Sequence, residues 1–509
     1  MEQKLEKTQG AGGFARIFRK KSPEEIIGTT KKAGLAKTLG AFDLTVLGIG
    51  AIIGSGIFTL AGTAALGTPG NPGAGPGLMI SFIFAAIACG FAALCYAEFA
   101  TMIPAAGSTY TYTFATLGEL AAWLIGWILM LEYAIGNITV ACGWTGYVFE
   151  FLKGFTHVLP AFVTDDKYWI YQLDIPSLHH TLFLNIPAIF IMLLVTAILY
   201  KGVQESTKMA GIMVAVKIVV IALFVGIGAF YVKPANWHPF VPNGFNSLIG
   251  GAAVIFFAYI GFDAVSTAAE ETKDPQKNLP IGIISSLVIC TLIYIIVAAV
   301  LTGIIPYKQI NAEAPVAAAM RLIGHGNVAG FISFGAVAGL TSVLLVLQYG
   351  AIRILYAMSR DGLLPKVFSK VHPKFKTPHI ITIIAGIFVA LGTVVLNLDE
   401  AARLCNIGTL TAFMVVCASV IILRIKDPHR ERPFKVPFSP LLPLLGIGSC
   451  FWLITGLPLK TIVLFGLWIV AGIAIYFAYA YRRPEEPLYV HEEVPVIEET
   501  TKESQPVSQ

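Results

Sequence analysis

The chain has 509 residues, of which 56% are hydrophobic and only 13% are charged. Ordinary globular chains carry about 25% charged residues, so this composition indicates a polytopic membrane protein and excludes a typical soluble one. The net charge is +5. Because membrane orientation explains where the basic residues lie, we expect no nucleic-acid partner. The sequence contains no phosphate-loop, HExxH or GxSxG motif, which argues against an ATP-driven pump or a hydrolase. We therefore expect no enzyme activity, no cofactor and no metal.

Residues 1–40 are polar and basic and lack the apolar core of a signal peptide, so they are expected to form a cytoplasmic N-terminal segment. Twelve apolar segments follow and predict an all-α integral membrane domain of twelve spans over residues 41–482. They lie near residues 41–66, 77–102, 117–150, 183–200, 209–232, 246–269, 281–305, 327–352, 379–397, 403–424, 440–457 and 461–481. With a cytoplasmic N-terminus, the inner connections hold most of the 35 basic residues, which places both termini inside. Residues 483–509 predict a disordered, acidic cytoplasmic tail.

The first apolar segment contains a run of glycines at its centre, Gly48, Gly50, Gly54 and Gly56. Each glycine costs a helix about 1 kcal/mol relative to alanine, so the Gly-Ser-Gly sequence predicts a break in mid-membrane. Loosened backbone is tolerated there where it is buried in protein or lines a cavity. Free N–H groups after the break suit a carboxylate, and free carbonyl groups before it suit an ammonium, so the pattern favours an amino acid site. Close helix packing through the Gly50/Gly54 pair is the alternative.

The sixth segment carries a matching interruption at Gly261 and Asp263. The two interrupted segments are five spans apart and so run in opposite directions through the membrane, as an inverted repeat requires. Such a pair indicates the central site of a secondary transporter.

These motifs resemble those of a known family. Residues 50–58 read Gly-Ala-Ile-Ile-Gly-Ser-Gly-Ile-Phe and residues 257–265 read Phe-Ala-Tyr-Ile-Gly-Phe-Asp-Ala-Val. Together with residues 269–283, 104–110 and 353–365, they resemble the amino acid–polyamine–organocation (APC) transporters, and the cationic amino acid transporter branch, of bacterial type, in particular. The resemblance covers roughly residues 36–482. It implies a five-plus-five inverted repeat with broken helices 1 and 6, two extra helices, and alternating access.

The resemblance also implies a substrate site. It places the substrate carboxylate on N–H groups around Gly54, Ser55 and Gly56, and the amine near carbonyl groups of the two breaks. Phe257 matches the aromatic gate over the substrate; a packing or lipid-facing aromatic is the alternative. The implied substrate-binding residues are Ile52, Ile53, Gly54, Ser55, Gly56, Phe257, Ile260 and Asp263.

Charged residues inside spans need a reason, because each costs about 2.5–3.5 kcal/mol at the bilayer centre. Lys217 matches a fifth-helix lysine that replaces the sodium ion in some proton-coupled members of the family, and Thr341 and Ser342 match the hydroxyl ligands of that sodium site. Snorkelling of Lys217 to the interface is the alternative. Asp263 either caps the half-helix that follows it or titrates during transport. Glu132 either belongs to a proton path or satisfies a neighbouring polar group.

We therefore expect a plasma-membrane carrier that takes up neutral or cationic L-amino acids, coupled to protons. An amino acid exchanger, and from another class a membrane sensor or channel, are the alternatives. Its partners are the amino acid, protons and membrane lipid. The sequence does not decide whether a small accessory membrane subunit binds, or whether the substrate resembles alanine or arginine.

Overall fold

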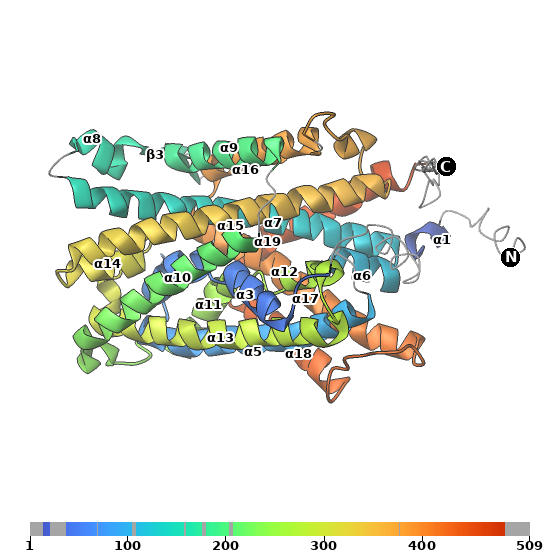
Figure 1. Ribbon diagram of the computed structural model, residues 1–509, viewed down its shortest axis with the longest axis horizontal. Coiled ribbons are helices and arrows are strands. Elements are labelled where there is room, and N and C mark those ends of the chain that lie inside the picture. Colours follow the sequence, from blue (N-terminus) through green and yellow to red (C-terminus); the bar gives the residue numbers. More distant parts are fainter. Residues whose placement is uncertain are drawn as a thin grey trace, which may run out of the picture.

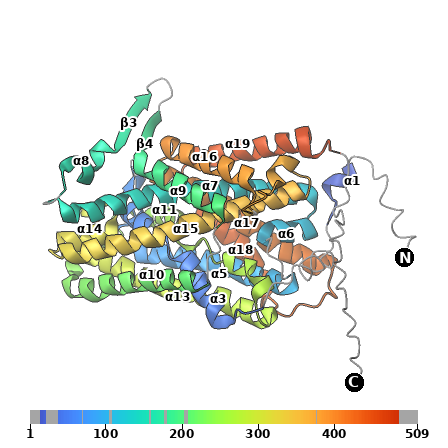
Figure 2. The same ribbon diagram turned by 45° about the horizontal axis from the view of Figure 1, so that its top comes forward.

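A computed structural model describes residues 14–20, 37–68, 70–103, 108–156, 159–175, 180–202, 207–375 and 377–483. Within these ranges the chain is mainly helical, and most helices lie along the long axis of the molecule (Figure 1). The short helix α1 (Phe14–Ile17) lies at one end, here termed the α1 face. The hairpin of β3 (Ile170–Ile175) and β4 (His180–Asn185) extends from the opposite end, termed the hairpin face (Figure 2).

Seven helices of the described part are long and apolar enough to cross a membrane. These are α5 (Leu78–Met102), α7 (Glu119–Leu152), α10 (Thr207–Gly228), α13 (Pro275–Ile304), α15 (Gly326–Arg360), α17 (Leu398–Lys426) and α19 (Leu459–Ile475), which continues into a π-helical turn. The pair formed by α3 (Ala41–Ile52) and the helical stretch Gly56–Leu66 adds an eighth if it is counted as one bent span. The chain is thus a multi-pass membrane protein.

Four shorter apolar helices complete the set within the described ranges: α9 (Ile186–Lys201), α11 (Phe245–Ile255), α16 (His379–Val395) and α18 (Leu441–Thr455). These helices fall within the remaining apolar segments of the sequence. Because they are short for a spanning helix, the count of twelve spans and the inverted repeat stay predictions.

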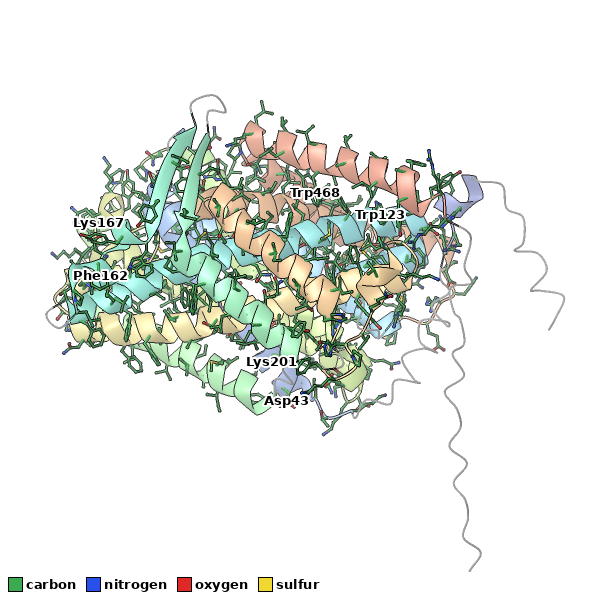
Figure 3. The ribbon with its side chains drawn as sticks, turned by 90° about the horizontal axis from the view of Figure 1, so that it is seen from above. Asp43, Trp123, Phe162, Lys167, Lys201 and Trp468 are labelled. Carbon is green, nitrogen blue, oxygen red and sulfur yellow. The ribbon has the colours of Figure 1, made fainter. Side chains whose placement is uncertain are left out.

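The long helix α7 forms the centre of the packing. It lies against α15 and α17 along much of its length, while α13 packs against α5 and α3. Toward the α1 face, α7 also contacts α19, where the rings of Trp127 and Trp468 stack 4.4 Å apart. Trp123 donates a hydrogen bond of 2.9 Å from its indole N–H to the carbonyl of Gly472. Figure 3 shows Trp123 and Trp468 on these neighbouring helices, and Phe162 and Lys167 near the opposite end.

The structure adds two small antiparallel hairpins to the predicted all-α fold. One joins β1 (Gly67–Thr68) to β2 (Asn71–Pro72), and the other pairs β3 with β4 from Ile170↔Asn185 to Ile175↔His180. The first lies in a connection between apolar segments, and the second lies mostly in the connection before the segment at residues 183–200, where hydropathy carries no information about strands. The all-α description therefore holds for the membrane part and not for these connections.

Two buried carboxylates fasten connections at the α1 face. Glu98, near the end of α5, accepts hydrogen bonds from Arg424 and from the backbone N–H of Val436, and so holds the connection between α17 and α18. Glu119, the first residue of α7, forms ion pairs of 3.2 Å with Arg16 and 2.9 Å with Arg19. The second carboxylate thereby attaches the α1 segment to the bundle. The predicted tail lies outside the described residues, apart from Arg483.

A backbone link joins the chain just before α3 to the chain just after the sixth segment. The N–H groups of Thr38 and Leu39 donate to the carbonyl of Glu271 over 2.9 and 3.0 Å, and the N–H of Lys273 donates to the carbonyl of Leu39 over 2.8 Å. Leu39 and Thr272 form an isolated parallel bridge at this point. The α1-face ends of the two interrupted segments are therefore connected directly.

Candidate functional site

The first interruption lies between α3 and a π-helical turn, η3 (Gly56–Leu60). Ile53 caps α3 in an extended conformation, and the two helical parts are bent by 42° relative to each other. Gly54 and Ser55 lie between these elements, and the Ser55 hydroxyl is buried without a hydrogen-bond partner among the described residues. The first N–H groups of a helix lack partners within it and carry partial positive charge. This end of η3 can therefore accept a carboxylate.

The second interruption lies in the sixth segment, after the 3-10 turn η10 (Phe256–Tyr259) that continues α11. Ile260 is extended, and Gly261 has a φ of +118°, before the short helix α12 (Ala264–Thr267) begins. A Cβ atom at Gly261 would also lie 2.8 Å from the carbonyl oxygen of Ala51 in α3. Conformation and space both require glycine here.

The two interruptions touch each other. A Cβ atom on Gly56 would lie 2.2 Å from the Cα atom of Ala258, so the backbones approach as closely as glycine permits. The hydroxyl of Tyr294, from α13, lies 2.8 Å from the carbonyl oxygen of Ile52 and 2.9 Å from that of Ala258. One hydroxyl shared by two carbonyl groups fixes the distance between the breaks. Each carbonyl keeps a second lone pair, so a substrate ammonium can still approach Ile52.

Phe257 lies where four helical segments meet. Its side chain is 6% exposed. A Cβ atom at Gly136 of α7 would lie 4.0 Å from the Phe257 ring and 3.6 Å from both Cδ1 of Leu347 and Sγ of Cys405. Gly136 thus leaves room for one small group between an aromatic ring, a leucine and a thiol. The groups in contact are apolar, and the buried residue Glu132 lies one helical turn along α7 from Gly136.

Lys217 of α10 is buried between α3 and α15, with 2% of its surface exposed. Its ammonium donates a hydrogen bond of 2.9 Å to the carbonyl oxygen of Gly50, close to the first interruption. A Cβ atom at Gly339 of α15 would lie 3.1 Å from Cε and Cγ of Lys217, so a glycine accommodates the aliphatic part of the side chain. The ammonium therefore points into the protein and does not snorkel to the interface.

The two hydroxyls expected beside Lys217 bond elsewhere. Thr341 accepts a hydrogen bond of 3.0 Å from the indole N–H of Trp144 in α7 and donates to the carbonyl of Val337. Ser342 donates over 2.8 Å to the carbonyl of Gly339, the residue that contacts Lys217. Ser342 therefore bonds to Gly339, which itself contacts Lys217. Thr341 belongs to the packing between α15 and α7.

The two intramembrane carboxylates differ in their surroundings. Asp263 is buried and occupies the N-cap position of α12, but its side chain makes no capping hydrogen bond there. Glu132 is buried on α7 facing α17, and its Oε2 atom has no hydrogen-bond partner among the described residues. Its own carbonyl accepts a hydrogen bond from the thiol of Cys405 over 3.3 Å. Capping, one of the two roles expected for Asp263, is therefore absent in this conformation.

Two residues that position the interruptions did not emerge from the sequence. Tyr294 is one, and Asn406 of α17 is the other: its amide N–H₂ donates to the carbonyl groups of Ala253 and Val254 over 2.7 and 2.9 Å. A polar side chain within an apolar segment was the available signal in both cases, since such groups need partners in the membrane. Among the described residues, no group of three His, Cys, Asp or Glu side chains could hold a metal ion.

Several known proteins are similar in sequence to this chain. Residues 39–481 match the family model described as "Amino acid permease". The "Branched-chain amino acid permease BcaP" of Bacillus subtilis (strain 168) is 50% identical over 466 residues, covering 91% of this chain and 97% of the relative. The "Methylthioribose transporter" of the same organism is 49% identical over 467 residues, covering 92% and 98%. The "Cationic amino acid transporter 9, chloroplastic" of Arabidopsis thaliana is 36% identical over 474 residues, covering 91% and 81%.

Proposed function

We propose that this chain, which belongs to the amino acid permease family of the APC superfamily and so is a transporter rather than an enzyme, takes up neutral L-amino acids together with protons by alternating access. The amino acid would bind at the two touching interruptions. Its carboxylate would lie on the N–H groups from Gly54 to Gly56, and its ammonium near the carbonyl groups of Ile52, Phe257 and Ile260. Ile53, Ser55 and Asp263 would complete the site.

The observation that carries proton coupling is the hydrogen bond from Lys217 to Gly50. The ammonium nitrogen of Lys217 is bonded to the backbone beside the proposed substrate site, so a proton held there contributes to the contact between α10 and α3. Loss of the proton would remove the charge that binds α10 to α3, and its return would restore it. Protonation would thereby favour one arrangement of α3, as a coupled transporter requires.

The apolar surroundings of Phe257 support a neutral substrate. Leu347, Cys405 and Gly136 offer van der Waals contact to a substrate side chain. A cationic side chain would lose its hydration among these three groups, which is unfavourable unless a carboxylate pairs with it. The relative named as a branched-chain amino acid permease fits such a site, and we propose leucine, isoleucine, valine and alanine as substrates.

Basic residues support the orientation. We propose that the α1 face lies in the cytoplasm, because the connections at that face carry most of the 35 basic residues. The chain would then cross the plasma membrane twelve times with both termini inside, residues 41–482 forming the transporter domain, and lipid would surround its apolar outer faces.

The test is uptake of labelled leucine into sodium-free proteoliposomes that are acidic outside. We expect accumulation above equilibrium for the native protein and no gradient-driven accumulation for Lys217→Met, while leucine binding by the purified variant stays near native. Lys201→Met, an exposed lysine at the end of α9, is the matched control and should accumulate leucine normally. Unchanged accumulation by Lys217→Met would remove this lysine from coupling.

The same vesicles separate the alternatives. Uptake that requires preloaded amino acid and ignores the pH gradient would indicate an exchanger. Binding without flux would indicate a sensor, and large unitary currents a channel. Methylthioribose has neither carboxylate nor ammonium, so inhibition of leucine uptake by excess methylthioribose would contradict a site built on the backbone of the first interruption.

A further inference from the structure

A cavity of about 390 Å³ opens beside the sixth segment, between α4 (Ala61–Leu66), α11, α17 and the turn from α18 to α19. It lies toward the hairpin face: Gly62 of α4 contacts Asn311 and Pro315, at the start of α14 (Pro315–Leu322), which Figure 1 places at that end. The exposed side chains of Asn246 and Thr455 form its rim.

The inner end of the cavity approaches the proposed substrate site. Val254 lines it and lies three residues before Phe257, which corresponds to about 4.5 Å along a helix axis. Thr63 and Arg403, both buried, line it as well. The cavity thus leads from the hairpin face to within one helical turn of the sixth interruption.

Arg403 is the charged group that a ligand in this cavity would meet. Its side chain is buried, with 4% of the residue exposed. Its Nε–H donates to Asp399 over 2.8 Å, and one Nη2–H donates to the hydroxyl of Thr68 over 3.3 Å. A guanidinium group has five N–H donors. Among the described residues, Arg403 uses two of them in these two bonds, so donors remain for a ligand.

The side chains that line the cavity indicate the chemical class of its ligand. A guanidinium fork matches the geometry of a carboxylate, and the rim and walls add amide and hydroxyl groups from Asn71, Asn246 and Thr63. The volume falls in the range of small-molecule sites and is far larger than one inorganic ion needs. Because Asp399 already balances the charge of Arg403, a ligand without net charge is favoured over an anion. A zwitterionic amino acid meets all three conditions.

We propose that this cavity is a second amino acid site, which holds an incoming substrate by its carboxylate on Arg403 before the substrate enters the central site. The proposal rests on the proposed function, which places the hairpin face outside the cell. An occupied outer site would keep substrate within one helical turn of Phe257 while the central site is closed. It would not require any residue of the central site for its own affinity.

The test is the amount of labelled L-leucine bound per chain by the purified full-length protein at saturation. Two variants empty the outer site by different means: Asn246→Trp fills the exposed rim, and Arg403→Lys keeps the charge opposite Asp399 but removes the fork. Both should halve the leucine bound and leave the affinity of the remaining leucine unchanged. Phe245→Trp is the control, since Phe245 is exposed on the same helix and does not line the cavity.

Competition and a central-site variant make the outcomes distinct. Leucinol, which lacks the carboxylate, should fail to displace the outer leucine, whereas unlabelled valine should displace both. A single bound leucine that is lost in Phe257→Ala and kept in Asn246→Trp would overturn the outer site and leave the proposed function intact. A single leucine with the reverse behaviour would support the outer site and overturn the central one. Absence of any leucine binding would overturn both.

Discussion

The two interruptions use glycine for different physical reasons. In the first, Gly56 is required by contact, because its Cα faces the backbone of Ala258 at a distance that leaves no room for a side chain. In the sixth, Gly261 is required by conformation, because its φ of +118° is rarely adopted by other residues. The first break is followed at once by eleven helical residues, Gly56–Leu66, and the sixth by a helix of four, Ala264–Thr267.

This difference indicates that the two interruptions have different roles. A break that continues directly into a helix presents N–H groups and partial positive charge, so in the proposed site the first interruption would supply the anion-binding part. The sixth interruption would supply carbonyl groups and the ring of Phe257. Tyr294 joins the two by its single hydroxyl. Substitutions that act on one element of this arrangement at a time can test it.

The largest effect is expected from Gly56→Ala. Its methyl group would meet the backbone of Ala258, which cannot move aside without opening the contact between the breaks. We expect loss of leucine uptake and a clear fall in thermal stability in detergent. Gly90→Ala, in the long helix α5, is the matched control, because a methyl group there would meet nothing within 4 Å. Equal damage from both substitutions would show that the contact with Ala258 is not the reason for glycine.

An intermediate effect is expected from Gly261→Ala. Adoption of positive φ by alanine costs about 1–3 kcal/mol, and the methyl group would also press on the carbonyl of Ala51. We expect a lower unfolding temperature with reduced but measurable uptake. Gly244 also has positive φ, at +78°, but a Cβ atom there meets nothing within 4 Å. Gly244→Ala should therefore lose stability without losing leucine affinity, and a loss of affinity there would contradict this separation.

The smallest effect is expected from Tyr294→Phe. Removal of the shared hydroxyl leaves the ring in place and deletes a hydrogen bond worth about 1 kcal/mol. If the hydroxyl sets the distance between the breaks, leucine should bind roughly fivefold more weakly. Tyr259→Phe removes a hydroxyl that bonds to Phe82, outside both breaks, and should leave leucine affinity unchanged. Native affinity in Tyr294→Phe would mean that the breaks keep their distance without this bond.

Features that depend on local sequence were predictable. The cluster of glycines at 48–56 marked the first interruption, and Gly261 marked the sixth, because glycine destabilises a spanning helix and paired breaks are typical of secondary transporters. Lys217 was predictable as a special residue for a similar reason: a charge within an apolar run is expensive.

Features that depend on distant pairs were not predictable. Thr341 accepts a hydrogen bond from Trp144. Nothing in the sequence around either residue indicates that the two side chains form a pair. The contact of Tyr294 with two breaks, the cavity at Arg403 and the fastening of residues 424–436 by Glu98 each join segments far apart in the chain. Hydropathy and motif spacing describe single segments, so they carry no information about which segments meet.

The link between residues 38–39 and 271–273 consists of backbone hydrogen bonds alone. Its strength is therefore independent of which side chains occupy these positions, provided that the N–H groups remain. An alanine scan would leave these backbone bonds in place, and a phenotype at Leu39 or Thr272 would report the packing of their side chains. Only a change to the main chain, such as Leu39→Pro, which removes one of the donor N–H groups, would reveal how far the α1-face ends of the two interrupted segments depend on each other.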